Sequence, residues 1–348
     1  MYYGSSFSYI AVFVTVMSLY AKDCFASKAA YCPEGVRIAQ VGILGTGVFE
    51  ILIGLLIMKI GKAALDKVLP PVISGSMAIV IGIGLAGAAL GMAGANWTIA
   101  IVTLLLTVVF SVYLQNRGLL GMLPILLGAI AGYLISIPFG LVDFSTVTSA
   151  PIFRIPAITL PAFEDLGRAP LEIKNLIGLN LVADGADDLV MGLIGGTAGT
   201  NYGENNSLMA ITRNYSVPVL MAAGVMAILL GFVGTLAALV ASIPVAVTGG
   251  LAIYLFGVIG MQGIALIQSE KVNLFEPRQL AVGATILICG IGGNMTLKDG
   301  LFPFLIPYVF PVGVPAIVFA AFAGIVMNLI FLVLPPKMFG VEERENLN

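Results

Sequence analysis

Residues 195–213 read GGTAGTNYGENNSLMAITR and interrupt a chain that is otherwise strongly apolar. Tyr202, Gly203, Glu204, Asn205 and Asn206 stand in a row, immediately before another hydrophobic run. The stretch 202–213 is too short to cross a bilayer, because a transmembrane helix needs about 20 residues. Its polar beginning predicts a half-helix that starts from extended chain inside the membrane.

The composition agrees with a membrane location. Of the 348 residues, 59% are hydrophobic and 10% are charged, and the mean hydropathy is +1.07, whereas a soluble domain carries about 25% charged residues. Runs such as LLTVVF and MAILLGF do not alternate in polarity as the strands of a membrane barrel do. The sequence therefore predicts an all-α polytopic membrane protein. Its candidate membrane segments are 3–20, 38–58, 68–94, 97–114, 118–142, 176–195, 217–243, 245–267, 279–295 and 314–334, and the stretch 143–174 is predicted to be a loop.

Several functional classes find no support in the sequence. Histidine is absent, which removes the usual imidazole proton shuttle and most zinc sites. No basic cluster suggests a nucleic acid, and no nucleophile–base pair suggests an enzyme. We therefore expect neither a cofactor nor a metal, and no catalytic residues.

Three pairs of segments repeat in the same order along the chain. LPPVISGSMAI at 69–79 aligns with SIPVAVTGGLAI at 242–253, so that Gly75 meets Gly249. Small residues just upstream also align, and YYGSSF at 2–7 resembles NYGENN at 201–206. One such match between helices rich in Gly and Ala can arise by chance, but three in the same order are typical of internal repeats. Paired halves with interrupted segments indicate a secondary transporter with its site at the repeat interface.

The membrane topology that the basic residues predict requires one more crossing than the candidate segments provide. The positive-inside rule places the basic loops of both halves in the cytoplasm, and segment 118–142 then ends outside. Only 176–195 and the broken crossing at 202–213 separate that end from Arg213, which two crossings would leave outside. Either the charges orient one half upside down, or a crossing is missing near residues 143–175. The basic residues used are Lys59, Lys62, Lys67, Arg117, Arg213, Lys271, Arg278, Lys337 and Arg344.

Glu204 is the strongest candidate for a functional side chain. A carboxylate inside a bilayer is costly unless it is paired, protonated or facing water, and such residues usually serve function. A broken helix exposes backbone N–H groups that can donate to a ligand, while Glu204 can accept from ligand N–H groups. The alternative is a carboxylate that only caps the break. Phe7, in GSSF, could stack on a flat ring from the opposite broken crossing.

Other polar or glycine-rich features are predicted to be structural. Glu50 lies within an apolar segment with no other polar residue near it, which favours a structural or interface role. The acids of VADGADDLVMG, at 182–192, are expected near a helix N-terminus, where they complement the helix dipole. GIGLAG at 82–87 has the letters of a dinucleotide motif but lies inside an apolar helix. Gly84, Gly87 and Gly91 are instead expected to allow close helix packing.

TNYGENNSLMAITR at 200–213 and IPVAVTGGLAIYLFGVIG at 243–260 closely resemble the nucleobase–cation symporter family, the nucleobase/ascorbate transporters, and within it the bacterial uracil permeases. The family motif is Glu or Gln, Asn-x-Gly, four residues and Thr. It corresponds here to Glu204, Asn205, Asn206, Ser207 and Thr212, with Ser207 in place of the usual glycine. YYGSSF resembles the segment that faces this motif.

The resemblance implies two inverted repeats, a core domain that moves against a gate domain, and nucleobase uptake coupled to protons. By position, Gly203, Glu204 and Asn205 would bind the base, Phe7 would contact it from the opposite strand, and Phe256 would lie in the gate near the pocket. The acidic form of the motif favours uracil. The implied core parts are 1–65 and 175–243, the gate parts are 68–142 and 244–335, and 336–348 is a tail.

The chain also departs from the family pattern. It starts at what resembles the third span, and it passes from ITLPAF to EDLGRAPLEIKN where the family has its eighth span. That span is the crossing that the charge count lacks, so transport by this chain is in doubt. The alternatives are a non-transporting membrane remnant or dimerising fragment, and an anion transporter of the same fold. Self-association into a homodimer also stays open.

Overall fold

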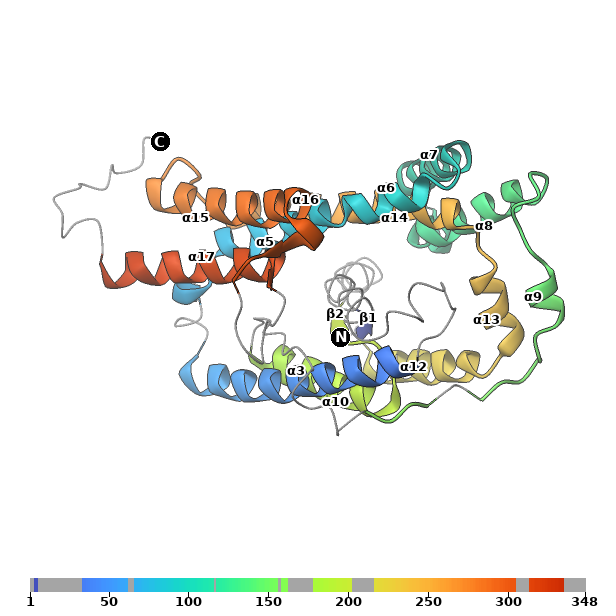
Figure 1. Cartoon of the computed structure of the whole chain (residues 1–348), viewed down its shortest axis with the longest axis horizontal. Coiled ribbons are helices and arrows are strands. Elements are labelled where there is room, and N and C mark those ends of the chain that lie inside the picture. The colour runs from blue at the N-terminus through green and yellow to red at the C-terminus, as the bar shows by residue number, and fades with distance from the viewer. Residues whose placement is uncertain are drawn as a thin grey trace. The chain divides into compact units, whose positions relative to one another are not determined.

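The computed structural model describes residues 3–5, 33–61, 66–115, 117–155, 158–161, 178–201, 216–304 and 313–334. Contacts divide the chain into two compact units, each of which draws on both halves of the sequence. Unit 1 comprises Met1–Gly47, Ala86–Leu166 and Ala186–Leu255, and unit 2 comprises Val48–Leu85, Gly167–Gly185 and Phe256–Asn348. Figure 1 shows the elements of both units, which are described separately below.

The described part of the chain is mostly helical. Its α-helices are α3 (Pro33–Ile60), α5 (Pro71–Gly84), α6 (Ala86–Ala93), α7 (Trp97–Tyr113), α8 (Pro124–Ser136), α9 (Ser145–Thr148), α10 (Gly178–Ile194), α12 (Val217–Gly231), α13 (Gly234–Ala241), α14 (Val245–Ser269), α15 (Pro277–Leu287), α16 (Gly293–Thr296) and α17 (Ala316–Val333). A π-helix, η4 (Ile288–Gly292), joins α15 to α16, and η2 (Gly118–Met122) and η5 (Lys298–Gly300) are 3₁₀ turns. The strands are β1 (Tyr3–Ser5), β2 (Gly199–Asn201), β3 (Leu301–Phe302) and β4 (Val314–Pro315).

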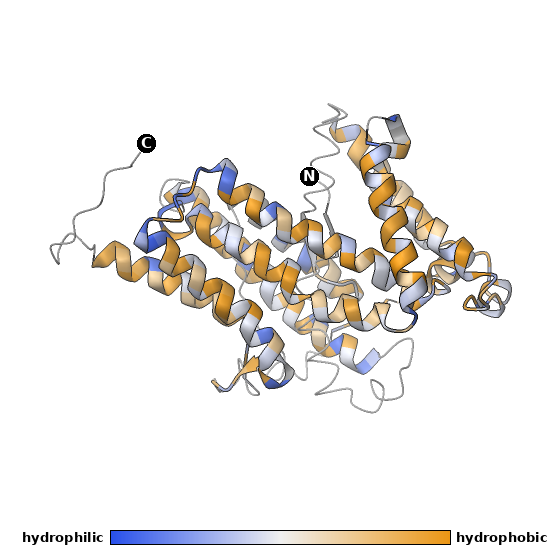
Figure 2. Ribbon diagram, turned by 90° about the horizontal axis from the view of Figure 1, so that it is seen from above, coloured by the Kyte–Doolittle hydropathy of each residue, from blue (hydrophilic) through white to orange (hydrophobic). Residues whose placement is uncertain are grey.

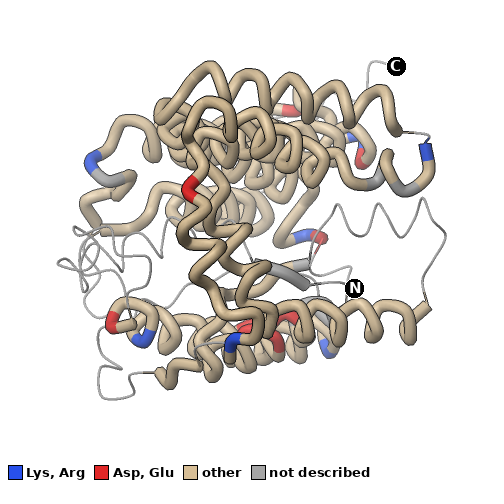
Figure 3. The backbone as a smooth tube through the Cα atoms, turned by 90° about the vertical axis from the view of Figure 1, so that its right-hand side faces the viewer, with Lys and Arg blue, Asp and Glu red and all other residues tan. Residues whose placement is uncertain are grey.

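The helices have the length and surface of membrane spans. Five helical stretches, Pro33–Ile60, Pro71–Ala93, Val245–Ser269, Pro277–Thr296 and Ala316–Val333, are long and apolar enough to cross a bilayer. Large apolar side chains such as Leu52, Val112 and Ile228 are exposed, and Figure 2 shows that hydrophobic residues predominate along the helices. Charged residues are sparse along the backbone in Figure 3. The prediction of an all-α polytopic membrane protein is therefore confirmed.

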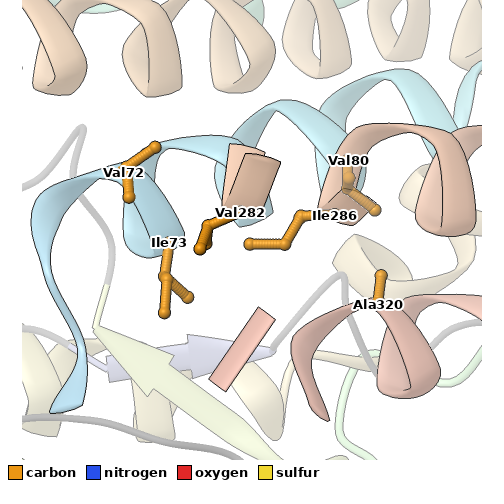
Figure 4. Packing of buried hydrophobic residues seen from close by; sticks show 6 residues of the cluster. All are labelled: Val72, Ile73, Val80, Val282, Ile286 and Ala320. Carbon is orange, nitrogen blue, oxygen red and sulfur yellow. The ribbon is translucent and has the colours of Figure 1, made fainter. Parts of the chain in front are cut away.

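The core of unit 2 is the α5–α15–α17 bundle. Val72, Ile73 and Val80 of α5 pack with Val282 and Ile286 of α15 and with Ala320 of α17, as Figure 4 shows. Ile286 also fills the space beside Gly324 on α17, where a β-carbon would overlap it. The cluster is apolar and closed, because each of these side chains is at most 2% exposed.

A polar side chain completes the α5–α15–α17 bundle. Asn328 of α17 is 1% exposed and accepts a hydrogen bond from Arg278 Nη2 at 2.8 Å. Its own amide donates to the carbonyl oxygens of Lys67 at 2.8 Å and Val68 at 2.9 Å. Asn328 thereby ties the beginning of α15 and the chain before α5 to α17.

Unit 1 contains a second bundle, formed by α7, α8 and the first part of α14. Ile99, Ala246 and Val247 form its apolar core. A β-carbon on Gly128 or Gly132 of α8 would overlap the hydroxyl of a buried threonine on α7, Thr107 or Thr103 respectively. Small residues on α8 therefore let it approach α7 closely, as membrane helices commonly do.

The internal repeat seen in the sequence appears as reciprocal contacts. In unit 2, a β-carbon on Gly75 would overlap Ile267; in unit 1, a β-carbon on Gly249 would overlap the backbone of Ala93. Gly249 is the repeat partner of Gly75, and Ile267 stands at the same 174-residue offset from Ala93. Gly82 and Phe256 share that offset, and a β-carbon on Gly82 would overlap the Phe256 carbonyl. The contact of Gly75 with Ile267 therefore has an equivalent in the other unit, the contact of Gly249 with Ala93, which joins the repeat partners of the same two residues.

These contacts correct the prediction about the glycines at 84–91. Close approach occurs at Gly75 and Gly82, about one and three turns into α5 and on the face toward α14, whereas β-carbons on Gly87 and Gly91 would meet nothing within 4 Å. The reason is that α5 ends at Gly84 and the chain restarts as α6 at Ala86. The interruption turns the later glycines onto another face.

The loop that follows α8 interrupts a segment predicted to be continuous. Phe153 forms an isolated antiparallel bridge with Val233, and Arg154 N donates to the Phe232 carbonyl at 2.8 Å. The expected span 217–243 is therefore broken into α12 and α13, because loop backbone pairs with the break. In the same loop, hydrogen bonds from Ser145 hold the pKa of Asp143 below its usual value.

Candidate functional site

The two short strands of unit 1 lie at the predicted broken crossings. β1 pairs antiparallel with β2, with Tyr3 opposite Asn201, Gly4 opposite Thr200 and Ser5 opposite Gly199. The sequence predicted extended chain at 2–7 and 201–206, so β1 agrees and β2 lies two residues earlier than expected. Strands from the two halves of the chain thus meet directly before both motif segments (Figure 1).

The antiparallel register sends the two motif segments away from opposite ends of the strand pair. The chain leaves β1 after Ser5 and reaches Phe7 two residues later, and it leaves β2 after Asn201 and reaches Glu204 three residues later. A three-residue strand is about 10 Å long. Phe7, Gly203, Glu204 and Asn205 lie outside the described residues, so their role as a site stays a prediction.

Phe256 is the one predicted site residue that the structure describes. It lies in α14 and is 4% exposed. Its backbone carbonyl is the group that Gly82 of α5 approaches. Its contact with a base stays a prediction. Glu50, expected to be structural, is likewise buried, at 3% exposed.

The acids of α10 are not at a helix N-terminus. α10 begins at Gly178 and has no acidic residue in its first turn, so Asp184, Asp187 and Asp188 lie in its middle. The expectation that they complement the helix dipole is therefore wrong. Asp184 is 2% and Asp188 0% exposed. Two buried carboxylates within a helix require polar partners in the protein.

Asp188 uses its carboxylate to hold the first residue of β2. Its Oδ1 accepts a hydrogen bond from Gly199 N at 2.7 Å. The adjacent Asp187 carboxylate occupies the place of a β-carbon on Gly199. Ala198, the residue before the strand, is fully buried and packs on Ile43 of α3. Gly199 is thus fixed by a hydrogen bond and by close packing.

Gln40 of α3 is a buried polar residue that sequence reasoning missed. It is 0% exposed, and its Nε2 donates to the carbonyl oxygens of Thr159 at 2.7 Å and Gly192 at 2.8 Å. Gln40 Oε1 and Thr159 Oγ1 are buried and have no hydrogen-bond partner among the described residues. The signal in the sequence was a single amide in the apolar run IAQVGILG. We refer to α10, the β1–β2 pair, Gln40 and Thr159 as the α10–β2 region.

The chain matches one protein-family model and is similar in sequence to several known permeases. The sequence model described as the permease family matches residues 1–166 and 166–299. The uracil permease of Bacillus caldolyticus is 34% identical, over 94% of this chain and 80% of that protein. The uracil permease of Bacillus subtilis (strain 168) is 32% identical over 94% and 80%, and that of Escherichia coli (strain K12) is 34% identical over 84% and 73%.

The same comparisons show that the chain is shorter than its relatives. The alignment with the Bacillus caldolyticus protein runs over 370 positions, whereas 94% of the 348 residues is about 327, so about 43 positions contain no residue of this chain. The two pieces of the family match meet at residue 166. This point lies within the stretch where the charge count lacks a crossing. The relatives are permeases, and with its apolar helices the chain is a multi-pass protein of the cell membrane.

Proposed function

Since this chain belongs to the permease family, we propose that it binds uracil or a related nucleobase and takes it up in symport with protons. The observation that carries the proposal is the β1–β2 pair. It joins the two halves of the chain directly before the segments that contain Phe7 and Glu204. A pair of interrupted crossings at a repeat interface is where secondary transporters bind their substrates.

Glu204 is the residue proposed to recognise the base. A carboxylate accepts hydrogen bonds and has none to donate, and uracil offers N–H groups to it. At the start of the predicted half-helix, the backbone N–H groups of Gly203 and Asn205 would lack intrahelical partners and could donate to a carbonyl oxygen of the base. Phe7 and Phe256 supply apolar surfaces on which a flat ring packs.

The proposed motion separates a core group from a gate group. The core comprises 1–65 and 175–243, and the gate comprises 68–142 and 244–335. In support, α5 packs on α15 and α17, whereas α14 packs on α7 and α8. Each first gate helix thus packs against gate helices from the other half of the chain, as expected of a gate built from both halves.

The shorter length of this chain supports a second candidate, a remnant that binds without transporting. The alignment with the Bacillus caldolyticus protein has about 43 positions with no residue of this chain, which in total exceeds the length of a membrane span of about 20 residues. Loss of a span beside the site would admit water, which weakens every charge-assisted contact. We therefore expect weaker uracil binding than in a full-length permease.

Uracil binding by the purified protein in detergent tests the assignment. The variants are Glu204→Gln, which keeps the shape but exchanges an acceptor oxygen for a donor, and Glu34→Gln, a matched change at an exposed position of α3. Loss of one charge-assisted hydrogen bond is expected to weaken binding at least about tenfold for Glu204→Gln, with no change for Glu34→Gln. Equal affinity of all three proteins would place the site elsewhere.

Uptake distinguishes the transporter from the remnant. The chain and a variant with a membrane span inserted at residue 166 are reconstituted into liposomes, and labelled uracil is followed with and without an inward proton gradient. Gradient-driven uptake by the unaltered chain supports the symporter. Binding without uptake, together with uptake by the extended variant, supports the remnant.

A further inference from the structure

Asp188 is the hydrogen-bond partner of a backbone N–H group on the outer edge of the β1–β2 pair. In a bilayer, every backbone polar group must find a partner within the protein. A two-stranded sheet pairs its inner edge, but N–H and C=O groups on the outer edges remain. Gly199 N, at the start of β2, donates to Asp188 Oδ1 at 2.7 Å. The carboxylate thus satisfies a backbone group that a lone strand pair leaves over.

The position of this hydrogen bond makes it an anchor for both strands. Gly199 faces Ser5 in the register, so a support that fixes Gly199 also fixes the end of β1 from which the chain leaves toward Phe7. Along β2, the same residue begins the strand that leads to Glu204 five positions later. One side chain on α10 therefore supports the end of β1 that leads to Phe7 and the beginning of the strand that leads to Glu204.

Packing leaves the strand little freedom around this anchor. The Asp187 carboxylate lies where a β-carbon on Gly199 would be. Ala198 is 0% exposed against Ile43. The β2 backbone is therefore confined between α3 and α10. The hydrogen bond from Gly199 to Asp188 fixes the position of β2 along the axis of α10.

We propose that Asp188 is a positioning residue for nucleobase binding, which acts by holding Gly199 and through it the β1–β2 pair, without touching the base. This inference rests on the proposed function, because the base is bound by the segments that follow the two strands. This positioning role requires a hydrogen-bond acceptor within reach of Gly199 N, at the position of residue 188 along α10. An amide oxygen at the same place can therefore substitute for the carboxylate.

The test compares Asp188→Leu, Asp188→Asn and Asp188→Glu in the full chain, with Asp187→Asn as the matched control. Two quantities are measured: hydrogen exchange of the peptide that contains residues 198–201, and uracil binding. Leu has no acceptor, so exchange is expected to rise and binding to fall at least about tenfold. Asn keeps an acceptor and is expected to restore both to within about threefold of the unaltered chain, as Asp187→Asn should.

Asp188→Glu keeps the charge but lengthens the side chain by one methylene, which displaces β2. It is expected to weaken binding several-fold in a folded protein, and it decides the matter if Asp188→Leu does not fold. Unchanged exchange in the Leu variant, or unchanged uracil affinity in the Leu or Glu variant, would overturn the proposal. If the unaltered chain binds no uracil, the proposed function fails alone, because exchange in the Leu and Asn variants still tests the anchor.

Discussion

The α5–α15–α17 bundle and the α10–β2 region bury polar groups in opposite ways. In the bundle, Asn328 uses both its amide oxygen and its amide nitrogen, and the surrounding contacts are apolar. In the α10–β2 region, Gln40 donates twice, but its oxygen and the hydroxyl of Thr159 have no hydrogen-bond partner among the described residues. The buried amide of the bundle therefore uses both its donor and its acceptor atoms, whereas the α10–β2 region keeps buried acceptor atoms that form no hydrogen bond with the described residues.

This difference separates scaffold from site. A closed apolar cluster with satisfied polar groups has one favourable geometry, because interiors pack as densely as organic crystals. Buried groups without a partner are uncommon and call for an explanation such as bound water or a functional role. Gln40 and Thr159 lie in the region that also anchors β2. We therefore expect substitutions in the bundle to change stability and those in the α10–β2 region to change binding.

Ile286→Ala gives the largest expected effect on the bundle. Ile286 is 0% exposed and packs between α5 and Gly324 of α17, so its truncation leaves a cavity that costs about 2–5 kcal/mol. Thermal unfolding in detergent measures the loss. Ile288→Ala, at a 72% exposed neighbour, is the control and is expected to change little. Similar losses for both would show that the bundle is not a packed core.

Asn328→Leu tests whether the polar node stabilises the same bundle. The substitution keeps the approximate size but leaves Arg278 and two backbone carbonyls without their partner. Leaving buried polar groups unsatisfied costs about 1–3 kcal/mol, and thermal unfolding again provides the measurement. Uracil affinity of the folded fraction is expected to stay the same. A change in uracil affinity with no change in stability would contradict the assignment of the bundle as scaffold.

Gly199→Ala moves the test to the α10–β2 region. The new methyl group overlaps the Asp187 carboxylate, and overpacking typically costs about 1–3 kcal/mol. Because β2 is held between α3 and α10, the methyl group is expected to displace the strand, and we expect most of the effect to appear as weaker uracil binding. Gly87→Ala, where a β-carbon meets nothing within 4 Å, is the matched control. A loss of stability with unchanged binding would contradict the assignment of this region as a site.

The sequence predicted those features that local pattern and the repeat encode. Apolar segments predicted the membrane fold, and the similarity of YYGSSF to NYGENN predicted the paired extended segments. The alignment of Gly75 with Gly249 predicted an internal repeat, which the contacts at both glycines reproduce. Each of these signals is present in the local sequence of a segment, read alone or compared with its repeat.

The features that were missed depend on distant parts of the chain. Phe153 pairs with Val233 across 80 positions, and no local pattern in 217–243 reveals that break. The acids of α10 were placed at a helix start, whereas the described part of the helix already begins at Gly178, six residues before Asp184. Gln40 was overlooked because a single amide in an apolar helix carries no sign of its partners. Their positions follow only from the packing of α3 against the chain at 158–161 and at Gly192.

Gln40→Met is expected to have the smallest effect on stability. Methionine matches glutamine in length, and the substitution removes an amide oxygen that has no partner as well as two donated hydrogen bonds. The carbonyl oxygens of Thr159 and Gly192 lose a donor, but the cost of burying an unused oxygen is also removed, so we expect a change within about 1 kcal/mol. Thermal unfolding checks this against Asn328→Leu, whose three hydrogen bonds have no such offset. If the spare oxygen contributes to function through water, uracil affinity or its pH dependence will change more than stability does. A loss of stability as large as that of Asn328→Leu, with unaltered uracil binding, would show that the α10–β2 region is scaffold as well.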